Sequence, residues 1–215
     1  VGRGQDTSYT VTNFTPIARI DYRFSDSKQL RVRYRGRTNQ PSINQLMPVT
    51  DNSDPLYRVE GNKNLKPEFT HSLSTNYQVN DRIKFSWFNV GLDLSYTQDD
   101  IVSKKYYTDE GVQISTYENT GKAVYSVNGR IMYNAPIGKS NFTINTFTRA
   151  GYNNGISYVR EQKDFVENET KNLNIFQMLR LTYRNDWAEI IAGGRVNYRN
   201  AKYSVGSMED VERWT

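Results

Sequence analysis

Residues 17–35 read IARIDYRFSDSKQLRVRYR. Apolar side chains occupy every second position on both sides of the polar stretch Ser25–Lys28, and charged or polar residues stand between them. A period of two is the side-chain period of a β-strand, and a short polar stretch between two such runs is typical of a hairpin turn. The stretch therefore predicts two antiparallel strands with one apolar face and one strongly basic face.

Three further hairpins follow the same pattern along the chain. Each consists of two alternating runs joined by a short polar turn, predicted at Asn80–Arg82, Ala135–Lys139 and Arg184–Trp187. The result is about eight strands of ~10 to 14 residues, whereas strands in soluble proteins commonly have ~5 to 6. Strands of this length can cross a bilayer at a tilt.

The connections between hairpins are much longer than the turns within them. Long loops are predicted over residues 38–68, 99–120 and 153–171. Alternation fades between Ile101 and Tyr117, where we expect either a hairpin above the membrane or an irregular loop. Short turns at one end and long loops at the other are typical of outer-membrane β-barrels.

Aromatic residues gather just before and just after the short turns. Tyrosine and tryptophan favour the bilayer interface because each combines an apolar ring with one polar group. The pattern predicts an aromatic girdle at the turn end, formed by Tyr22, Phe24, Tyr77, Trp87, Phe88, Tyr133, Phe142, Tyr183 and Trp187.

Composition narrows the class of protein further. Only 36% of the residues are hydrophobic, and no run approaches the ~20 apolar residues of a membrane helix. The chain has no cysteine, which excludes disulfides and thiolate metal sites. Residues Val1–Asp6 lack the basic and apolar regions of a signal peptide, so we expect either a mature chain or a piece of a longer one. The fold class is all-β, an antiparallel up-and-down transmembrane β-barrel, and the localisation is the cell outer membrane.

Three stretches in the first long loop carry a family resemblance: QPSINQL at 40–46, DNSDPL at 51–56 and GNKNLKPE at 61–68. They resemble the barrel of TonB-dependent outer-membrane receptors, although Lys63 stands where that family often has proline. The resemblance implies a barrel of roughly twenty-two strands, an N-terminal plug domain and nutrient import driven by TonB. By the resemblance, residues 1–215 are a single segment inside a larger barrel, without the plug, and residues from Met208 onward begin another loop.

Enzyme signatures are absent. Gly138–Ser140 lacks the earlier glycine of a phosphate loop, because Tyr133 stands there, and is better interpreted as a hairpin turn. The single histidine, His71, is predicted near the outer end of its strand, at the rim of the barrel. Asp51–Asp54 and Asp99–Asp100 lack the ligand spacing of a calcium loop, and turn formation is the favoured interpretation. We expect no catalytic residue, metal or cofactor.

Arginines occupy the positions opposite the apolar ones, and in a barrel they would line the lumen. They would form either a wall that favours anions or an ordinary polar wall paired with Asp21, Asp93, Glu189 or the plug. Nucleic-acid binding is not expected, because most tyrosines lie on the other face. The arginines are Arg19, Arg23, Arg31, Arg33, Arg35, Arg130, Arg149, Arg180, Arg184, Arg195 and Arg199.

The sequence therefore predicts an outer-membrane β-barrel segment of a receptor for nutrient uptake, with lipid, plug, TonB and a small unidentified nutrient as partners. Two alternatives stay open: a small self-contained outer-membrane barrel for adhesion or anchoring, and a soluble β-domain that binds an acidic polymer. The candidate ligand-binding residues lie in the long loops and are Asn52, Asp54, Tyr57, Asn62, Tyr106, Tyr107 and Tyr158.

Overall fold

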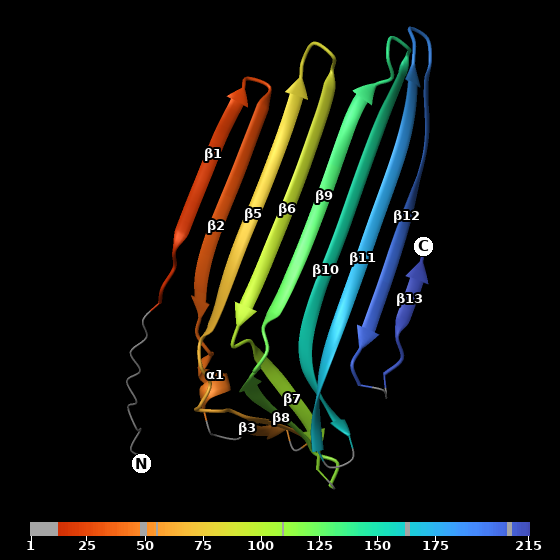
Figure 1. Ribbon diagram of the computed structural model, residues 1–215. Helices are drawn as coiled ribbons and strands as arrows, with labels where there is room; N and C mark the ends of the chain where they lie inside the picture. The colour runs from red at the N-terminus through yellow and green to blue at the C-terminus, as the bar shows by residue number, and fades with distance from the viewer. Residues whose placement is uncertain (1–12, 48–50, 55, 109, 162–163, 206–207) are drawn as a thin grey trace.

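A computed structural model describes residues 13–47, 51–54, 56–108, 110–161, 164–205 and 208–215. Its strands join in one 13-stranded sheet, in which eight long strands stand side by side (Figure 1). The long strands are β1 (Ile17–Ser25), β2 (Lys28–Asn39), β5 (Glu68–Asp81), β6 (Ser86–Gln98), β9 (Val124–Pro136), β10 (Phe142–Glu161), β11 (Asp164–Arg184) and β12 (Glu189–Tyr203).

The remaining elements are short. A capping box begins the only helix in the described residues: Ser42 Oγ accepts from the Gln45 amide, and Gln45 Oε1 accepts from the Ser42 amide. The short elements are α1 (Ile43–Leu46), β3 (Asp51–Asp54), β4 (Tyr57–Glu60), β7 (Ile101–Tyr107), β8 (Gln113–Asn119) and β13 (Val211–Trp214).

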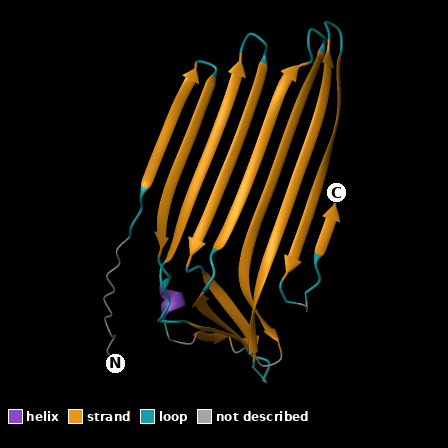
Figure 2. Ribbon diagram, in the orientation of Figure 1, coloured by secondary structure: helices purple, strands orange, loops and turns teal. Residues whose placement is uncertain are grey.

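Each long strand pairs antiparallel with the next long strand along the chain, and β13 follows β12. The four short turns lie together at one end of the sheet, and the chain between hairpins lies at the other (Figure 2). Within the described strands β1 pairs only with β2, and β13 pairs only with β12, so these strands form an open sheet.

The register places the alternating positions of all long strands on two common faces. Small, polar and arginine side chains share the polar face, as predicted. The apolar face carries the other parity, and one row across it is Ile20, Val32, Thr75, Leu92, Gly129, Ala150, Ile175 and Tyr198. Every pair in this row is directly opposed, so the period of two in the sequence becomes a continuous apolar surface.

The described residues leave that apolar surface uncovered. Ile190 is 61% exposed, and Leu179 and Ile131 are also exposed. The described core lies at the loop end, where Leu65 and Ile114 are buried. A large uncovered apolar face requires a partner, and along strands of this length a lipid bilayer fits.

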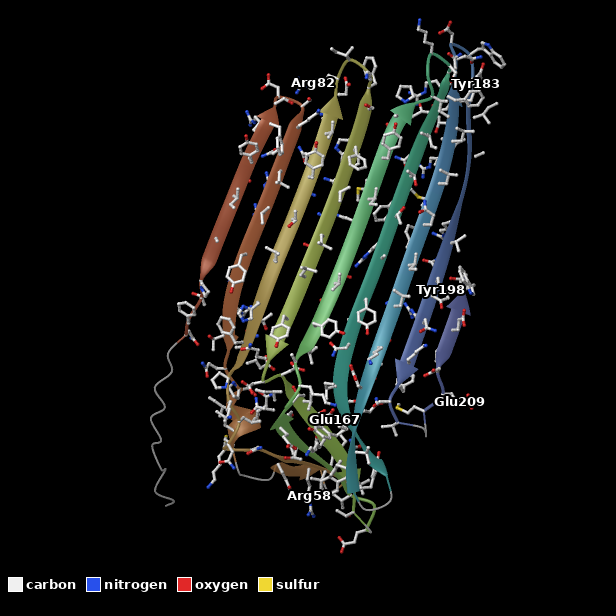
Figure 3. The ribbon with its side chains drawn as sticks, in the orientation of Figure 1. Arg58, Arg82, Glu167, Tyr183, Tyr198 and Glu209 are labelled. Atoms are coloured by element: carbon white, nitrogen blue, oxygen red, sulfur yellow. The ribbon has the colours of Figure 1, made fainter. Side chains whose placement is uncertain are left out.

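Aromatic side chains mark both edges of the apolar face. The girdle at the turn end is present, but Trp87 lies on the polar face, because neighbours along a strand point to opposite sides. Tyr183 lies near the turns, and Tyr198 lies far along the neighbouring strand (Figure 3). A second girdle, which was not predicted from the sequence, lies at the loop end of the apolar face and is formed by Tyr34, His71, Tyr96, Tyr125, Tyr152, Tyr198 and Trp214.

The prediction of a loop over residues 153–171 is wrong. Strands β10 and β11 continue through it and stay paired as far as Glu161 and Asp164. Asn168, which is 1% exposed, stabilises this extension. Its Nδ2 donates to Ser157 Oγ and Thr170 Oγ1 at 3.2 and 3.1 Å. Beyond the bilayer no lipid selects one apolar face, so the strands continue there without alternation.

Two other loop predictions are resolved. Strands β7 and β8 pair as a hairpin, so of the two expected alternatives, a hairpin and an irregular loop, the hairpin is confirmed. The prediction that residues from Met208 onward are a loop is wrong for Val211–Trp214, which is β13. The hairpin turn at Gly138 is confirmed, and its φ of 60° is one that glycine adopts without strain. The eight long strands that were expected are present, although β10 and β11, with 20 and 21 residues, are longer than predicted.

Candidate functional site at the loop end and on the polar face

Three loops build one small sheet beyond the long strands. Strands β7 and β8 form a hairpin, β4 runs parallel to β8, and β3 pairs with β4. Lys104 of β7 also pairs with Tyr158 near the tip of β10. We call β3, β4, β7, β8 and this tip the loop-end sheet. Figure 2 shows it beyond the loop ends of β2, β5, β6 and β9.

Residues 61–68, which carry the family resemblance, fasten the first loop to β8. Asn62 Nδ2 donates to the carbonyl of Tyr117 at 2.9 Å, and Asn62 Oδ1 accepts from the Asn64 amide at 2.9 Å. Leu65 is buried. A Cβ on Gly61 would lie 2.0 Å from the carbonyl oxygen of Met47, so only glycine fits there. These residues have a structural role in shaping the loop.

Asn119, the last residue of β8, completes the same fastening. Its Nδ2 donates to the carbonyls of Lys66 and Asp99 at 2.9 and 2.6 Å, and its Oδ1 accepts from the Lys66 amide at 2.7 Å. Glu68 Oε1 accepts from the Ile101 amide at 2.8 Å. Side chains thus satisfy backbone groups where the loops leave regular pairing.

Six of the predicted binding residues belong to the loop-end sheet, and the side chains of four of them are described, on two faces. Tyr57 and Tyr107 stand on either side of Gln113 in the register, and they are 40% and 61% exposed. The Tyr107 hydroxyl donates to Gln113 Oε1 at 3.2 Å. Two aromatic rings beside an amide provide apolar contact and hydrogen-bonding groups at one exposed surface.

On the opposite face Tyr106 packs edge-on against Phe165, with ring centroids 5.5 Å apart. Lys104 Nζ lies 4.2 Å from the centroid of the Tyr158 ring and also pairs with Glu118. These contacts join β7 to β10 and β11, so Tyr106 and Tyr158 have packing roles.

The other predicted binding residues are placed differently. Asn62 lies at the fastening described above. Asn52 and Asp54 belong to β3, but their side chains lie outside the described part of the structure.

The surroundings shift the pKa values of three ionisable groups at the loop end. Burial, reinforced by the neighbouring Glu68 carboxyl, raises the pKa of Asp100. Burial also raises the pKa of the Tyr158 hydroxyl, with a further contribution from Glu167. Glu167 in turn pairs with Lys122 at 2.7 Å and raises the pKa of that ammonium. Figure 3 shows Glu167 where β11 approaches the loop-end sheet.

On the polar face some arginines are neutralised by carboxylates and others are not. Asp21 pairs with Arg19 and Arg31, as the sequence analysis expected. The two other expected carboxylates pair as well, Asp93 with Arg130 and Glu189 with Arg184. None of the described carboxylates forms an ion pair with Arg149, Arg199 or Arg213.

A hollow of about 770 Å³ lies on the polar face between β9 and β13. Its lining includes three arginines, Arg149, Arg199 and Arg213, together with four asparagines and no aspartate or glutamate. Phe147 and Phe176 contribute rings 5.5 Å apart. Neither ring was predicted as a site residue, although a phenylalanine among the arginine positions breaks the alternation in the sequence and was a usable signal.

Among the described residues no cluster of three or more histidine or acidic side chains is arranged to hold a metal. The same residues include no helix long and apolar enough to cross a membrane.

The paired long strands, the uncovered apolar face and the two aromatic girdles define an outer-membrane-type β-barrel wall. The family model of the outer membrane protein beta-barrel family matches residues 2–209, and the chain belongs to that family. The chain has no match among the curated proteins. It is thus an outer-membrane β-barrel protein with lipid against its apolar face, in a family that is generally not enzymatic. A soluble β-domain does not fit this assignment.

Proposed function

We propose that the chain is part of a TonB-dependent-type receptor that captures a small nutrient outside the cell and imports it. The observation that carries the proposal is the loop-end sheet, in which three separate loops form one ordered platform. Tyr57 and Tyr107 are exposed on it. A receptor requires a binding surface held in place by a rigid scaffold, and binding residues are commonly carried by such loops.

We further propose that the segment lies inside a larger barrel with a plug domain in its lumen. The eight long strands, which could otherwise close a small barrel, belong to an open sheet: within the described strands β1 pairs only with β2, and β13 pairs only with β12. The unpaired arginines of the polar face would face the plug or the imported compound. An open sheet gives less support to a self-contained barrel for adhesion or anchoring.

Depletion of nutrients from the growth medium tests the uptake role even though the compound is unidentified. Three strains are compared by mass spectrometry of a complex medium: wild type, a deletion of the full-length gene and a deletion of TonB. We expect at least one compound to remain in the medium of both deletion strains. Re-expression of the full-length gene should restore its depletion, and re-expression with Tyr57→Ala and Tyr107→Ala should restore less.

If every compound that depends on TonB is still depleted in the gene deletion, the uptake role is wrong. Surface binding without depletion would instead favour the anchoring or adhesion alternative. An Ile83→Ala variant serves as the control, because Ile83 is exposed in a turn at the far end of the barrel wall.

A further inference from the structure

The hollow on the polar face combines an uncompensated positive charge with a defined shape. Arg149 lies on β10, Arg199 on β12 and Arg213 on β13, so three strands bring guanidinium groups to one cavity. Arg199 and Arg213 are directly opposed in the register. Like charges this close repel one another, and a bound anion would relieve the repulsion.

Elsewhere on the polar face the pairing of arginines is mixed. Within the described residues no ion pair is formed by Arg23, Arg33, Arg35, Arg180 or Arg195, and the hollow differs in gathering three unpaired arginines from three strands at one cavity. Arg19, Arg31 and Arg130 have carboxylate partners within the sheet. Among the described residues, the arginines of the hollow donate a side-chain hydrogen bond to a neutral group, from Arg199 Nε to Asn174 Oδ1 at 3.0 Å. That bond orients the Arg199 guanidinium and leaves its charge uncompensated.

The remaining lining defines what kind of anion fits. A guanidinium binds a carboxylate through two parallel N–H donors, and three of them favour a ligand with several carboxylates. The asparagines add amide donors and acceptors, and the rings of Phe147 and Phe176 add an apolar contact. A volume of about 770 Å³ is of the size that holds a small organic molecule.

We propose that this hollow is a binding site for carboxylate groups, with Arg149, Arg199 and Arg213 as the ligating residues. The carboxylates come from one of two sources: a free polycarboxylate compound in the lumen, or acidic side chains of the polypeptide that fills the lumen. The site rests on the barrel wall itself and goes beyond the proposed uptake role.

Citrate, a tricarboxylate, is the probe for the free-ligand source. Calorimetry measures the binding of citrate to the full-length gene product in detergent, at two salt concentrations. We expect saturable binding that weakens at least tenfold in R149Q/R199Q. The matched control R180Q/R195Q removes the same charge from the same face of β11 and β12 but lies outside the hollow, and it should bind citrate as wild type does.

Zero-length carboxyl-to-amine crosslinking tests the polypeptide source. The variant R149K/R199K keeps the charge and supplies amines, and R180K/R195K is its control. If the full-length chain fills the site itself, wild type binds no citrate, and an amine introduced at position 149 or 199 crosslinks to an aspartate or glutamate elsewhere in the protein. The amines introduced at positions 180 and 195 should not crosslink in this way. Folding of each variant is checked by its heat-dependent migration in detergent gels.

Two results would overturn the site. One is an equal loss of citrate binding in R149Q/R199Q and R180Q/R195Q, which would show only a generally basic wall. The other is the absence of both citrate binding and a crosslink specific to positions 149 and 199. Neither readout involves uptake, so failure of the site and failure of the receptor role are separate results.

Discussion

Arg130 Nη1 donates to Asp93 Oδ2 at 3.0 Å and joins β9 to β6 on the polar face. The Arg130 guanidinium reaches Asp93 by lying across Gly91, where an added Cβ would be 2.6 Å from Arg130 Cζ. Ser74 Oγ donates to the other carboxylate oxygen at 2.5 Å. Glycine at position 91 is therefore part of the ion pair, because any side chain there would push the guanidinium away.

Gly91→Ala should destabilise the full-length protein by about 1 kcal/mol, the order expected for a half-exposed charge-assisted hydrogen bond. Urea unfolding in detergent measures the change in free energy. In an Arg130→Gln background the same substitution should lower the free energy of unfolding by less, because the new Cβ no longer clashes with the Arg130 guanidinium. Gly194→Ala is the control, since nothing lies within 4 Å of its added Cβ. An equal cost in both backgrounds would contradict the interpretation.

Leu92→Arg should destabilise the protein by about 2–4 kcal/mol, because it places a charge on the lipid face midway between the girdles. Leu92 is 40% exposed on that face, so the cause is the loss of lipid contact rather than a core defect. Gln78→Arg on the polar face should change the free energy of unfolding by less than about 0.5 kcal/mol. Similar costs for the two variants, measured by unfolding in lipid vesicles, would argue against the assignment of the faces.

Asn119→Ala should loosen the loop end without unfolding the barrel wall. Three backbone groups of Lys66 and Asp99 lose their partner, at a local cost of about 1–2 kcal/mol. Hydrogen exchange of residues 64–68 should become roughly tenfold faster, while that of β11 is unchanged. The control is Asn64→Ala, whose side chain makes no hydrogen bond within the described structure. Unchanged hydrogen exchange in Asn119→Ala would show that the Asn119 hydrogen bonds contribute nothing to the stability of the loop end.

Asp100→Asn should stabilise the loop end at neutral pH but not in acid. The pKa of Asp100 is raised from 3.8, so the folded loop disfavours its charged form. Stability is therefore lost as pH rises through the raised pKa, and below the unfolded value both states are protonated. Residues 97–104 of the variant should exchange more slowly than wild type at pH 7.5 and equally at pH 3. Faster exchange at pH 7.5 would contradict the direction of the shift.

The long strands were predictable because a bilayer on one side and water on the other impose a strict alternation. In β2, for example, Leu30, Val32 and Tyr34 alternate with arginines, and the register follows that parity. The same physical reason explains why the prediction of a loop over residues 153–171 is wrong. Above the bilayer no lipid covers one face, the alternation disappears, and buried amides such as that of Asn168 stabilise the strands instead.

The candidate site was only partly visible in the sequence. The exposed tyrosines Tyr57 and Tyr107 were found, but their common position beside Gln113 depends on a parallel pairing of β4 with β8 that no local pattern predicts. The hollow depends on bringing Arg149 and Arg213 together from strands distant in sequence. Which arginines lack a carboxylate is likewise decided by register and not by composition.

The topology of the chain across the membrane is the most direct test of the outer-membrane barrel. Because the sequence has no cysteine, an introduced cysteine is the only thiol of residues 1–215 that can be labelled. Single cysteines replace the exposed loop-end residues Lys63, Lys105 or Glu110, and separately the exposed turn residues Asp26, Lys139 or Asp186, in the full-length gene product. Intact cells are treated with a membrane-impermeant maleimide. We expect labelling of the loop-end set alone, with the turn set labelled after the outer membrane is opened. Labelling of both sets in intact cells, or of neither set before lysis with the protein in the soluble fraction, would contradict an outer-membrane barrel with its loops outside.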